Sequence, residues 1–429
     1  MRRLVAASAI LAALLTMPNG AAAADPTPTP APIPTAGPPF PSTATDSARA
    51  TAALSYLLAV QFPDGSIDES LGETADYVIG AADAGYDPAT LTGCTAGGTG
   101  ALAFLATASD AATTDAAKTG KTILAVVASG LDPAAFSGRN LLARLAALYH
   151  ADTGAYGDGS TFPQAFAILA VDASGGTVPP AATARLAALQ GGDGSWSYGN
   201  TPVAAGGGDT NSTAMALMAL DAAGVHSADS AGFAYLATQQ LADGGFPYQN
   251  STTYGTPASD PDSDSVVLQA LVAAGQDPTS GGWSKGSANV LTSMRAGQII
   301  DGGFFFPGSG ESAFTTSQVP AALAGVPYGA KAKLRTGMAL PPTACANHGP
   351  VASAAGSVGT GLSSGAVPSA AASIEAAQTG ATATATGDSS SSNGGVGGLE
   401  PLVLLLVAVV LILLAGGGLW FYRARSRRR

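Results

Sequence analysis

The stretch LAALQGGDGSW at residues 186–196 decides the fold, because the same pattern returns three more times in the chain. The other copies are LLAVQFPDGSI at 57–67, LATQQLADGGF at 236–246 and MRAGQIIDGGF at 294–304. Each copy has a large apolar residue, then Gln four residues later, and Asp-Gly three residues after the Gln. A weaker copy at 145–156 keeps the apolar residue, the Asp and a final Tyr.

The pattern predicts a helix end followed by a tight turn. A Gln in the last helical turn can donate to free backbone carbonyls, and Asp-Gly is a common turn sequence. We expect the aromatic residue to fill the seam with the next repeat. These structural roles fall on Gln61, Asp64, Gln190, Asp193, Trp196, Gln240, Asp243, Phe246, Gln298, Asp301 and Phe304.

A second periodic signal marks where helices stop. Pairs of a small residue and glycine occur at 84–85, 129–130, 174–175, 223–224, 274–275 and 324–325, spaced 45 to 51 residues apart. Glycine after an apolar helical run is typical of the left-handed residue that ends a helix. The candidate caps that start these helices are Glu73-Thr74, Asp209-Thr210, Asp262-Ser263 and Glu311-Ser312. The sequence therefore predicts an all-α domain of six helical hairpins, over about 46–345.

The repeat Gln-x2-Asp-Gly-x-aromatic resembles that of the squalene/terpenoid cyclases and the protein prenyltransferase β-subunits. The resemblance implies an (α/α)6 toroid, in which the N-termini of an inner ring of helices surround a central cavity. Cobalamin carriers of the transcobalamin type and the complement thioester domain share this ring.

The cyclase chemistry requires an Asp-x-Asp-Asp run whose middle Asp is a strong acid. The matching place here reads Asp262-Ser263-Asp264-Ser265, and Asp209-Thr210-Asn211-Ser212 in the preceding repeat. Asp264, with Asp262, is the weak catalytic candidate. The simpler interpretation is that these acids cap helices, so we assign no catalytic residue.

Other chemistries of this fold lack their residues. His150, His226 and His348 are scattered and do not form a zinc pattern with a cysteine. Cys94 is followed by Thr-Ala where the thioester requires Gly-Glu-Gln. Asp260, Asp262 and Asp264 alternate as in calcium loops, but the central Gly and closing Glu are missing. No metal or cofactor is assigned.

The leading hypothesis is a non-catalytic binding module for a small ligand, which by resemblance to the carriers would be a corrinoid or another hydrophobic molecule. The second lobe that clamps the ligand in the carriers is absent. The ligand-binding candidates at the predicted mouth are Glu73, Asp76, Asp209, Asn211, Asp262, Asp264 and Glu311. The alternatives are a reduced terpenoid cyclase, and a structural or adhesive surface protein with a centre filled by side chains.

The two ends of the chain predict export and anchoring. Residues 1–24 read as a signal peptide, and 25–45 as an unfolded lead-in rich in Pro and Thr. Residues 346–399 read as a stalk of Ala, Ser, Gly and Thr. Residues 400–422 have the length of a transmembrane helix, and the basic residues 423–429 place the tail in the cytoplasm. We therefore expect a single-pass plasma-membrane protein; an uncleaved N-terminal anchor and a processed C-terminal anchor are the alternatives.

Charge and cysteines agree with this location. Seven of the 18 basic residues lie in the signal and the tail, which leaves 11 against 29 acidic residues. Such a surface disfavours nucleic acid, so the expected partner is a small molecule or a surface protein. Cys94 and Cys345 would oxidise outside the cell to a disulfide, although two free buried thiols remain an alternative.

Overall fold

The computed structural model describes residues 37–112, 114–252, 256–307, 310–330, 334–341 and 345. In these residues twelve α-helices follow one another as six hairpins. The first helices of the hairpins are α2 (Asp46–Val60), α4 (Ala101–Ala111), α6 (Leu141–Ala147), α8 (Pro180–Ala187), α10 (Asp229–Gln239) and α12 (Val290–Ala296). The second helices are α3 (Leu71–Asp83), α5 (Ala116–Ala128), α7 (Thr161–Ala173), α9 (Thr210–Ala222), α11 (Pro261–Ala273) and α13 (Ala313–Leu323).

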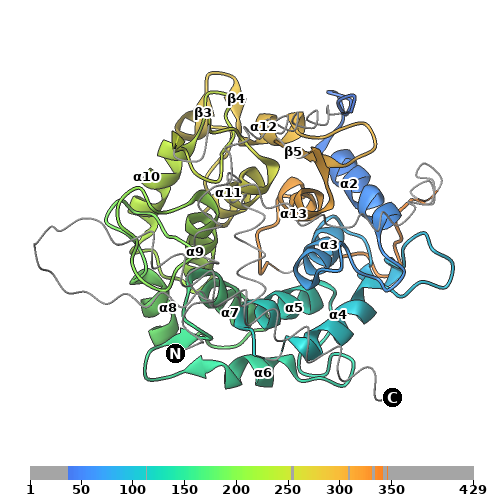
Figure 1. The fold of residues 1–429 in the computed structure, drawn as a ribbon, viewed down its shortest axis with the longest axis horizontal. Helices are drawn as coiled ribbons and strands as arrows, with labels where there is room; N and C mark the ends of the chain where they lie inside the picture. The colour runs from blue at the N-terminus through green and yellow to red at the C-terminus, as the bar shows by residue number, and fades with distance from the viewer. Residues whose placement is uncertain are drawn as a thin grey trace, which may run out of the picture. The chain divides into compact units, whose positions relative to one another are not determined.

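The second helices of the six hairpins form a closed inner ring (Figure 1). Each packs against the second helix of the next hairpin, and α13 packs back against α3. The first helices lie outside this ring, and almost every residue of the inner helices is buried. The arrangement is compatible with an α/α toroid, as the sequence predicts.

Short strands and 3-10 turns lie in the connections, which the all-α prediction did not include. Three antiparallel two-stranded hairpins occur in the described residues. They are β1 (Tyr149–His150) with β2 (Ala155–Tyr156), β3 (Ser284–Lys285) with β4 (Ala288–Asn289), and β5 (Phe304–Phe306) with β6 (Gly310–Ser312). The 3-10 turns are η1 (Pro88–Thr90) and η3 (Gly281–Trp283).

The predicted helix stops are confirmed. All six glycines that follow the inner helices have positive φ, from 65° after α11 to 89° after α3. This left-handed conformation is open to glycine at little cost and ends the helix.

The predicted Gln and Asp-Gly turns are also confirmed. Gln240 Nε2 donates to the carbonyls of Gly244 in its own turn and Trp283 in the next repeat, at 2.9 and 2.8 Å. Gln61, Gln190 and Gln298 make the same pair of bonds. Each Gln therefore ties its own turn to the following repeat.

The third repeat replaces this Gln from elsewhere in the chain. Tyr149 stands where four other repeats have Gln, but Gln164 of α7 donates to the carbonyls of Gly154 and Ala182, both at 2.9 Å. A Gln amide therefore makes these bonds in this repeat too, although it belongs to the inner helix α7 and not to the end of the outer helix. The weak sequence copy is thus a complete structural repeat.

The last repeat closes the ring on the first. Gln298 Nε2 donates to the carbonyl of Arg49 in α2, and Arg295 forms an ion pair with Asp46 at 2.6 Å. A disulfide joins Cys94 to Cys345, so the prediction of a bridge is confirmed. This bond connects the C-terminal end of the described chain to the connection between α3 and α4.

The predicted signal peptide, stalk, membrane span and basic tail lie outside the described residues. Among the residues that are described, none of the helices is long and apolar enough to cross a bilayer.

A candidate site at the centre of the helical ring

The six inner helices can be aligned by the residue that precedes each of them. The residues that precede these helices are Ser70, Asp115, Ser160, Asp209, Asp260 and Ser312. The predicted caps Asp209 and Ser312 are confirmed, whereas Glu73-Thr74 and Asp262-Ser263 were wrong. The true cap of α11 is Asp260, whose side chain accepts from the backbone N–H of Ser263 at 2.8 Å. Pro261 occupies the first helical position, where a missing N–H costs no hydrogen bond.

This register corrects the comparison of the fourth and fifth repeats. Asp260 is equivalent to Asp209, so Asp262 is equivalent to Asn211 and Asp264 to Thr213. The earlier alignment of Asp262 with Asp209 was displaced by two residues. The sequence alone does not show which aspartate precedes the helix, because aspartates occur at 260, 262 and 264.

The side chain of the fourth residue after the cap faces outward and accepts a hydrogen bond from the backbone just after the Asp-Gly turn. Thr213 Oγ1 accepts from the backbone N–H of Trp196 at 3.0 Å, and Asp264 Oδ1 accepts from that of Phe246 at 2.7 Å. Thr74, Gln164 and Thr316 make the same bond in other repeats. The weak catalytic candidate Asp264 therefore occupies a position that the repeat uses for structure.

The second, sixth and ninth residues after the cap share one helical stripe, which faces the centre of the ring. At the second position α9 carries Asn211 and α11 carries Asp262, and both side chains are fully buried. Among the described residues, the two polar atoms of Asn211 have no hydrogen-bond partner. The two carboxyl oxygens of Asp262 make no hydrogen bond of normal geometry, although the hydroxyl of Thr315 lies close enough to lower the pKa of this carboxyl. At the ninth position of α11, both polar atoms of Gln269 also lack one.

On the side of α3 and α5, the polar side chains at the sixth position are paired. Lys121 Nζ forms an ion pair with Asp76 Oδ2 at 2.6 Å, and the hydroxyl of Tyr328 donates to Asp76 Oδ1 at 2.6 Å. Lys121 also lies 5.3 Å from the centre of the Phe166 ring. Burial raises the pKa of Asp76, while Lys121 and Tyr328 lower it. Asp76, Lys121 and Phe166 are all sixth after their caps, so they form one layer.

Electrostatics distinguish Asp262 from a surface acid. Burial is the main cause that raises its pKa well above the usual range, and the neighbouring Asp260 raises it further. The hydroxyl of Thr315 on α13 has a smaller effect in the opposite direction. Burial therefore favours the protonated form of Asp262, which can donate a hydrogen bond or a proton.

The remaining predicted ligand residues separate into different environments. Asp209 caps α9 and is buried, which raises its pKa to about 6. Glu73 is buried near the start of α3. Glu311 lies in β6 beside Asp301 and Tyr56, where partial burial raises its pKa to about 7. Of the seven candidates, only Asp76, Asn211 and Asp262 occupy the stripe that faces the centre.

Sequence reasoning missed Lys121, Tyr328 and Gln269. Lys121 and Gln269 could have been found by counting six and nine residues from the correct caps. Tyr328 follows α13 and reaches Asp76 of the first repeat, so only ring closure brings it there.

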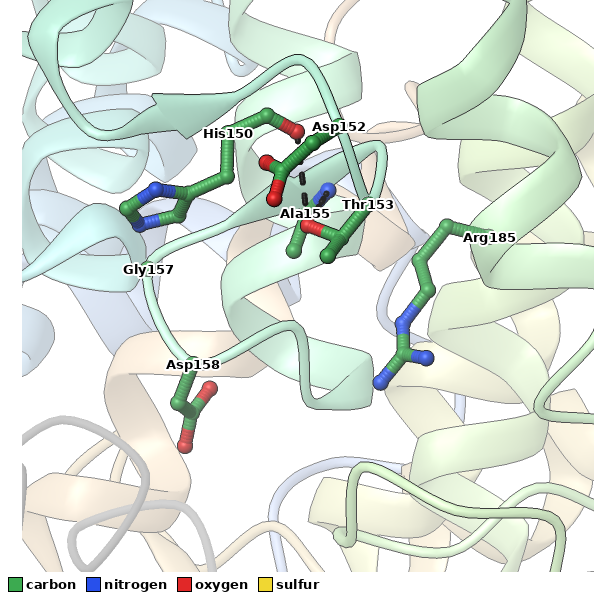
Figure 2. Close-up of a pocket in the computed structure, with 7 residues that line it drawn as sticks. All are labelled: His150, Asp152, Thr153, Ala155, Gly157, Asp158 and Arg185. Carbon is green, nitrogen blue, oxygen red and sulfur yellow. Dashed lines mark hydrogen bonds between the residues drawn. The ribbon is translucent and has the colours of Figure 1, made fainter.

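Two hollows lie away from the central stripe. One of 290 Å³ lies between the β1–β2 hairpin and α8, where Figure 2 shows Arg185 across from Asp158 and His150. Arg185 donates to the carbonyls of Gly159 and Asn200, so its charge already has partners. The other, of 440 Å³, lies between the start of α11 and α12.

No family model matches the sequence, and no curated protein matches it. Among solved structures, the chain is similar to an apo type II terpene cyclase from Scytonema, with a TM-score of 0.45 and 16% identity. The match covers 65% of this chain and 96% of that chain. The proposals below rest on the residues of this chain.

Proposed function

We propose that the ring is a binding module for a small polar molecule, held at the mouth of the inner ring by Asn211 and Asp262. The observation that carries this proposal is that two fully buried side chains, at the same position of two inner helices that pack together, hold polar atoms without hydrogen bonds of normal geometry. Each buried polar group left unpaired costs about 1–3 kcal/mol. A ligand or a bound water would remove that cost.

The donor set indicates the chemistry of the ligand. A protonated Asp262 offers one donor and one acceptor, and Asn211 offers both through its amide. Phe162 and Phe314 occupy the same register position on α7 and α13, and both are buried. A hydroxyl or carbonyl group on a small apolar frame fits this combination.

The paired side of the centre favours a small ligand over a corrinoid. Tyr328, Lys121, Asp76 and Phe166 meet there and fill part of the ring. We propose that the module works outside the cell, on a membrane anchor supplied by 400–422. The disulfide supports this location, because such bonds persist in oxidising compartments.

A second candidate function is a terpenoid cyclase of reduced form, which the raised pKa of Asp262 favours. The acid in this case would be Asp262 and not Asp264, whose Oδ1 is bonded to the turn. Replacement of Asp262 by Asn would then abolish turnover of a polyprenyl substrate, whereas Asp264→Asn would leave the acid in place.

Native mass spectrometry of the full chain, purified without reductant, tests the binding proposal. We expect a retained small-molecule mass on the wild type and on the exposed control variant Asp152→Asn. The double variant Asn211→Leu/Asp262→Asn should lack it. A bare wild-type mass, or an adduct that persists in the double variant, would contradict the proposal and favour a structural ring.

A further inference from the structure

The hollow between the start of α11 and α12 has a composition that the other repeats do not share. Its volume is 440 Å³, and its lining includes Asp243, Ser259, Asp264, Ser293 and Phe305. It lies on the outward side of α11, because Asp264 faces the turn and Asp262 faces the centre. The pocket is therefore separate from the central site.

Asp264 is the unusual residue of this pocket. Thr74, Thr213 and Thr316 accept the same backbone N–H with a neutral hydroxyl, and Gln164 does so with an amide. Asp264 accepts it with Oδ1, so one neutral oxygen would satisfy the fold. Its second oxygen, Oδ2, makes no hydrogen bond of normal geometry in the described chain, although the residue is only 1% exposed. The hydroxyl of Ser293 lies close enough to this carboxyl to lower its pKa.

Gly245 makes room for hydroxyl groups beside this oxygen. The first and fourth repeats have Ser66 and Ser195 at this position, and their hydroxyls donate to the turn aspartate at 2.6 Å. In the fifth repeat the donor to Asp243 is Ser259, at 2.8 Å. A Cβ on Gly245 would overlap the side chains of Ser293 and Ser259. The missing side chain thus leaves a cradle that two hydroxyls enter.

We propose that this pocket binds the ammonium group of a small primary amine. Asp264 Oδ2 supplies a carboxylate acceptor, Ser293 a hydroxyl acceptor, and Asp243 a second negative charge at the rim. A primary ammonium has three N–H donors, which matches these acceptors. Phe305 and Pro261 supply an apolar wall for a short hydrocarbon stem.

The nearby charges favour a cation and link its binding to pH. The charged neighbours of Asp264 are Asp260 and Asp262 on the same helix and Asp243 on the preceding turn, and all three are acidic. Arg295, the charged residue of α12, is paired with Asp46. Burial raises the pKa of Asp264 well above its usual range, while the hydroxyl of Ser293 and the backbone N–H of Phe246 lower it, so the protonated form of the free carboxyl is favoured. Binding of an ammonium then releases that proton, and affinity should rise with pH.

Calorimetric titration of the full chain with n-butylammonium tests the proposal. We expect saturable binding that strengthens at least tenfold from pH 6 to pH 8, with proton release. Butyltrimethylammonium, which lacks N–H donors, and neutral n-butanol should bind at least tenfold more weakly. Nα-acetyl-lysine methyl ester distinguishes the source: tighter binding than n-butylammonium indicates a lysyl side chain, and weaker binding a free amine.

Variants that borrow residues from neighbouring repeats supply the controls. Asp264→Thr and Gly245→Ser should each weaken n-butylammonium binding at least tenfold, and Asp264→Thr should keep or raise the melting temperature. Asp193→Asn, the matched change at the turn of the fourth repeat, should leave binding unchanged. Absence of saturable binding, equal binding of n-butanol, or full binding by a folded Asp264→Thr variant would overturn the proposal.

Discussion

The two sides of the ring's centre use polar residues in opposite ways. On the side of α3 and α5, Asp76, Lys121 and Tyr328 are buried and bonded to one another. On the side of α9 and α11, Asn211, Asp262 and Gln269 are equally buried, but they make no hydrogen bonds of normal geometry in the described chain. Both sides are built from copies of the same repeated unit and occupy the same helical stripe.

Under the proposed function, the difference separates a structural role from a binding role. A buried ion pair with all its partners fixes neighbouring helices and needs nothing more from outside. Buried polar groups without partners lower stability, and the fold does not require them, since Gly72, Ala117 and Phe162 stand at the equivalent of Asn211 and Asp262. The unpaired side is therefore where a ligand is expected.

The largest expected effect is on the paired side. Lys121→Met removes the cation and leaves Asp76 buried beside Tyr328, which should reduce the free energy of unfolding by about 3–5 kcal/mol. The double variant Asp76→Leu/Lys121→Met should recover most of this loss. Urea unfolding measures both variants, and an unchanged midpoint for Lys121→Met would show that the two sides do not differ.

The second expected effect is a fall in stability as pH rises. Burial raises the pKa of both cap residues Asp209 and Asp260 from 3.8 to about 6. A carboxyl with a higher pKa when folded contributes stability that is complete below about pH 4 and lost through about pH 6. Each pKa unit is worth about 1.4 kcal/mol, so melting temperatures should decrease by several degrees from pH 5 to pH 7.5.

Replacement of Asp209 and Asp260 by Asn keeps the caps and removes the titration. The profile of this double variant should be flatter between pH 5 and pH 7.5. A wild-type melting temperature that increases over this range would contradict the linkage.

The smallest expected effect comes from Gln269 on the unpaired side. Gln269→Met keeps the length of the side chain and removes two polar atoms without partners. We expect unchanged stability or a gain of about 1 kcal/mol. Gln240→Met is the matched control, because Gln240 donates to two carbonyls and its loss should destabilise the protein. A similar loss of stability in both variants would contradict this prediction and show that Gln269 stabilises the fold as Gln240 does.

The sequence predicted local features well and distant contacts poorly. The turn of Gln240, Asp243 and Gly244 and the helix stop at Gly224 depend on neighbours in the chain, and both were correct. The caps of α3 and α11 were misplaced by two or three residues, because several acids or hydroxyls compete within one turn. Gln164 and Tyr328 reach their partners only in the folded ring, so no local pattern revealed them.

The candidate site was predicted only in part. Asn211 and Asp262 were identified as polar residues near a helix start, but their roles depended on a register that the structure supplied. Asp264 was only the weak candidate for a catalytic acid, and it holds a turn. A helical stripe is visible in sequence only when the first residue of the helix is known.

The most direct test of the account is the stability of Asp262→Asn at pH 7.5, measured by urea unfolding of ligand-free protein. Asn reproduces the residue of the fourth repeat at this position and removes a buried acid whose pKa is raised. The account predicts a free energy of unfolding equal to or about 1–2 kcal/mol above that of the ligand-free wild type. A variant that is less stable by a similar amount would show that Asp262 serves the fold and would contradict a binding role.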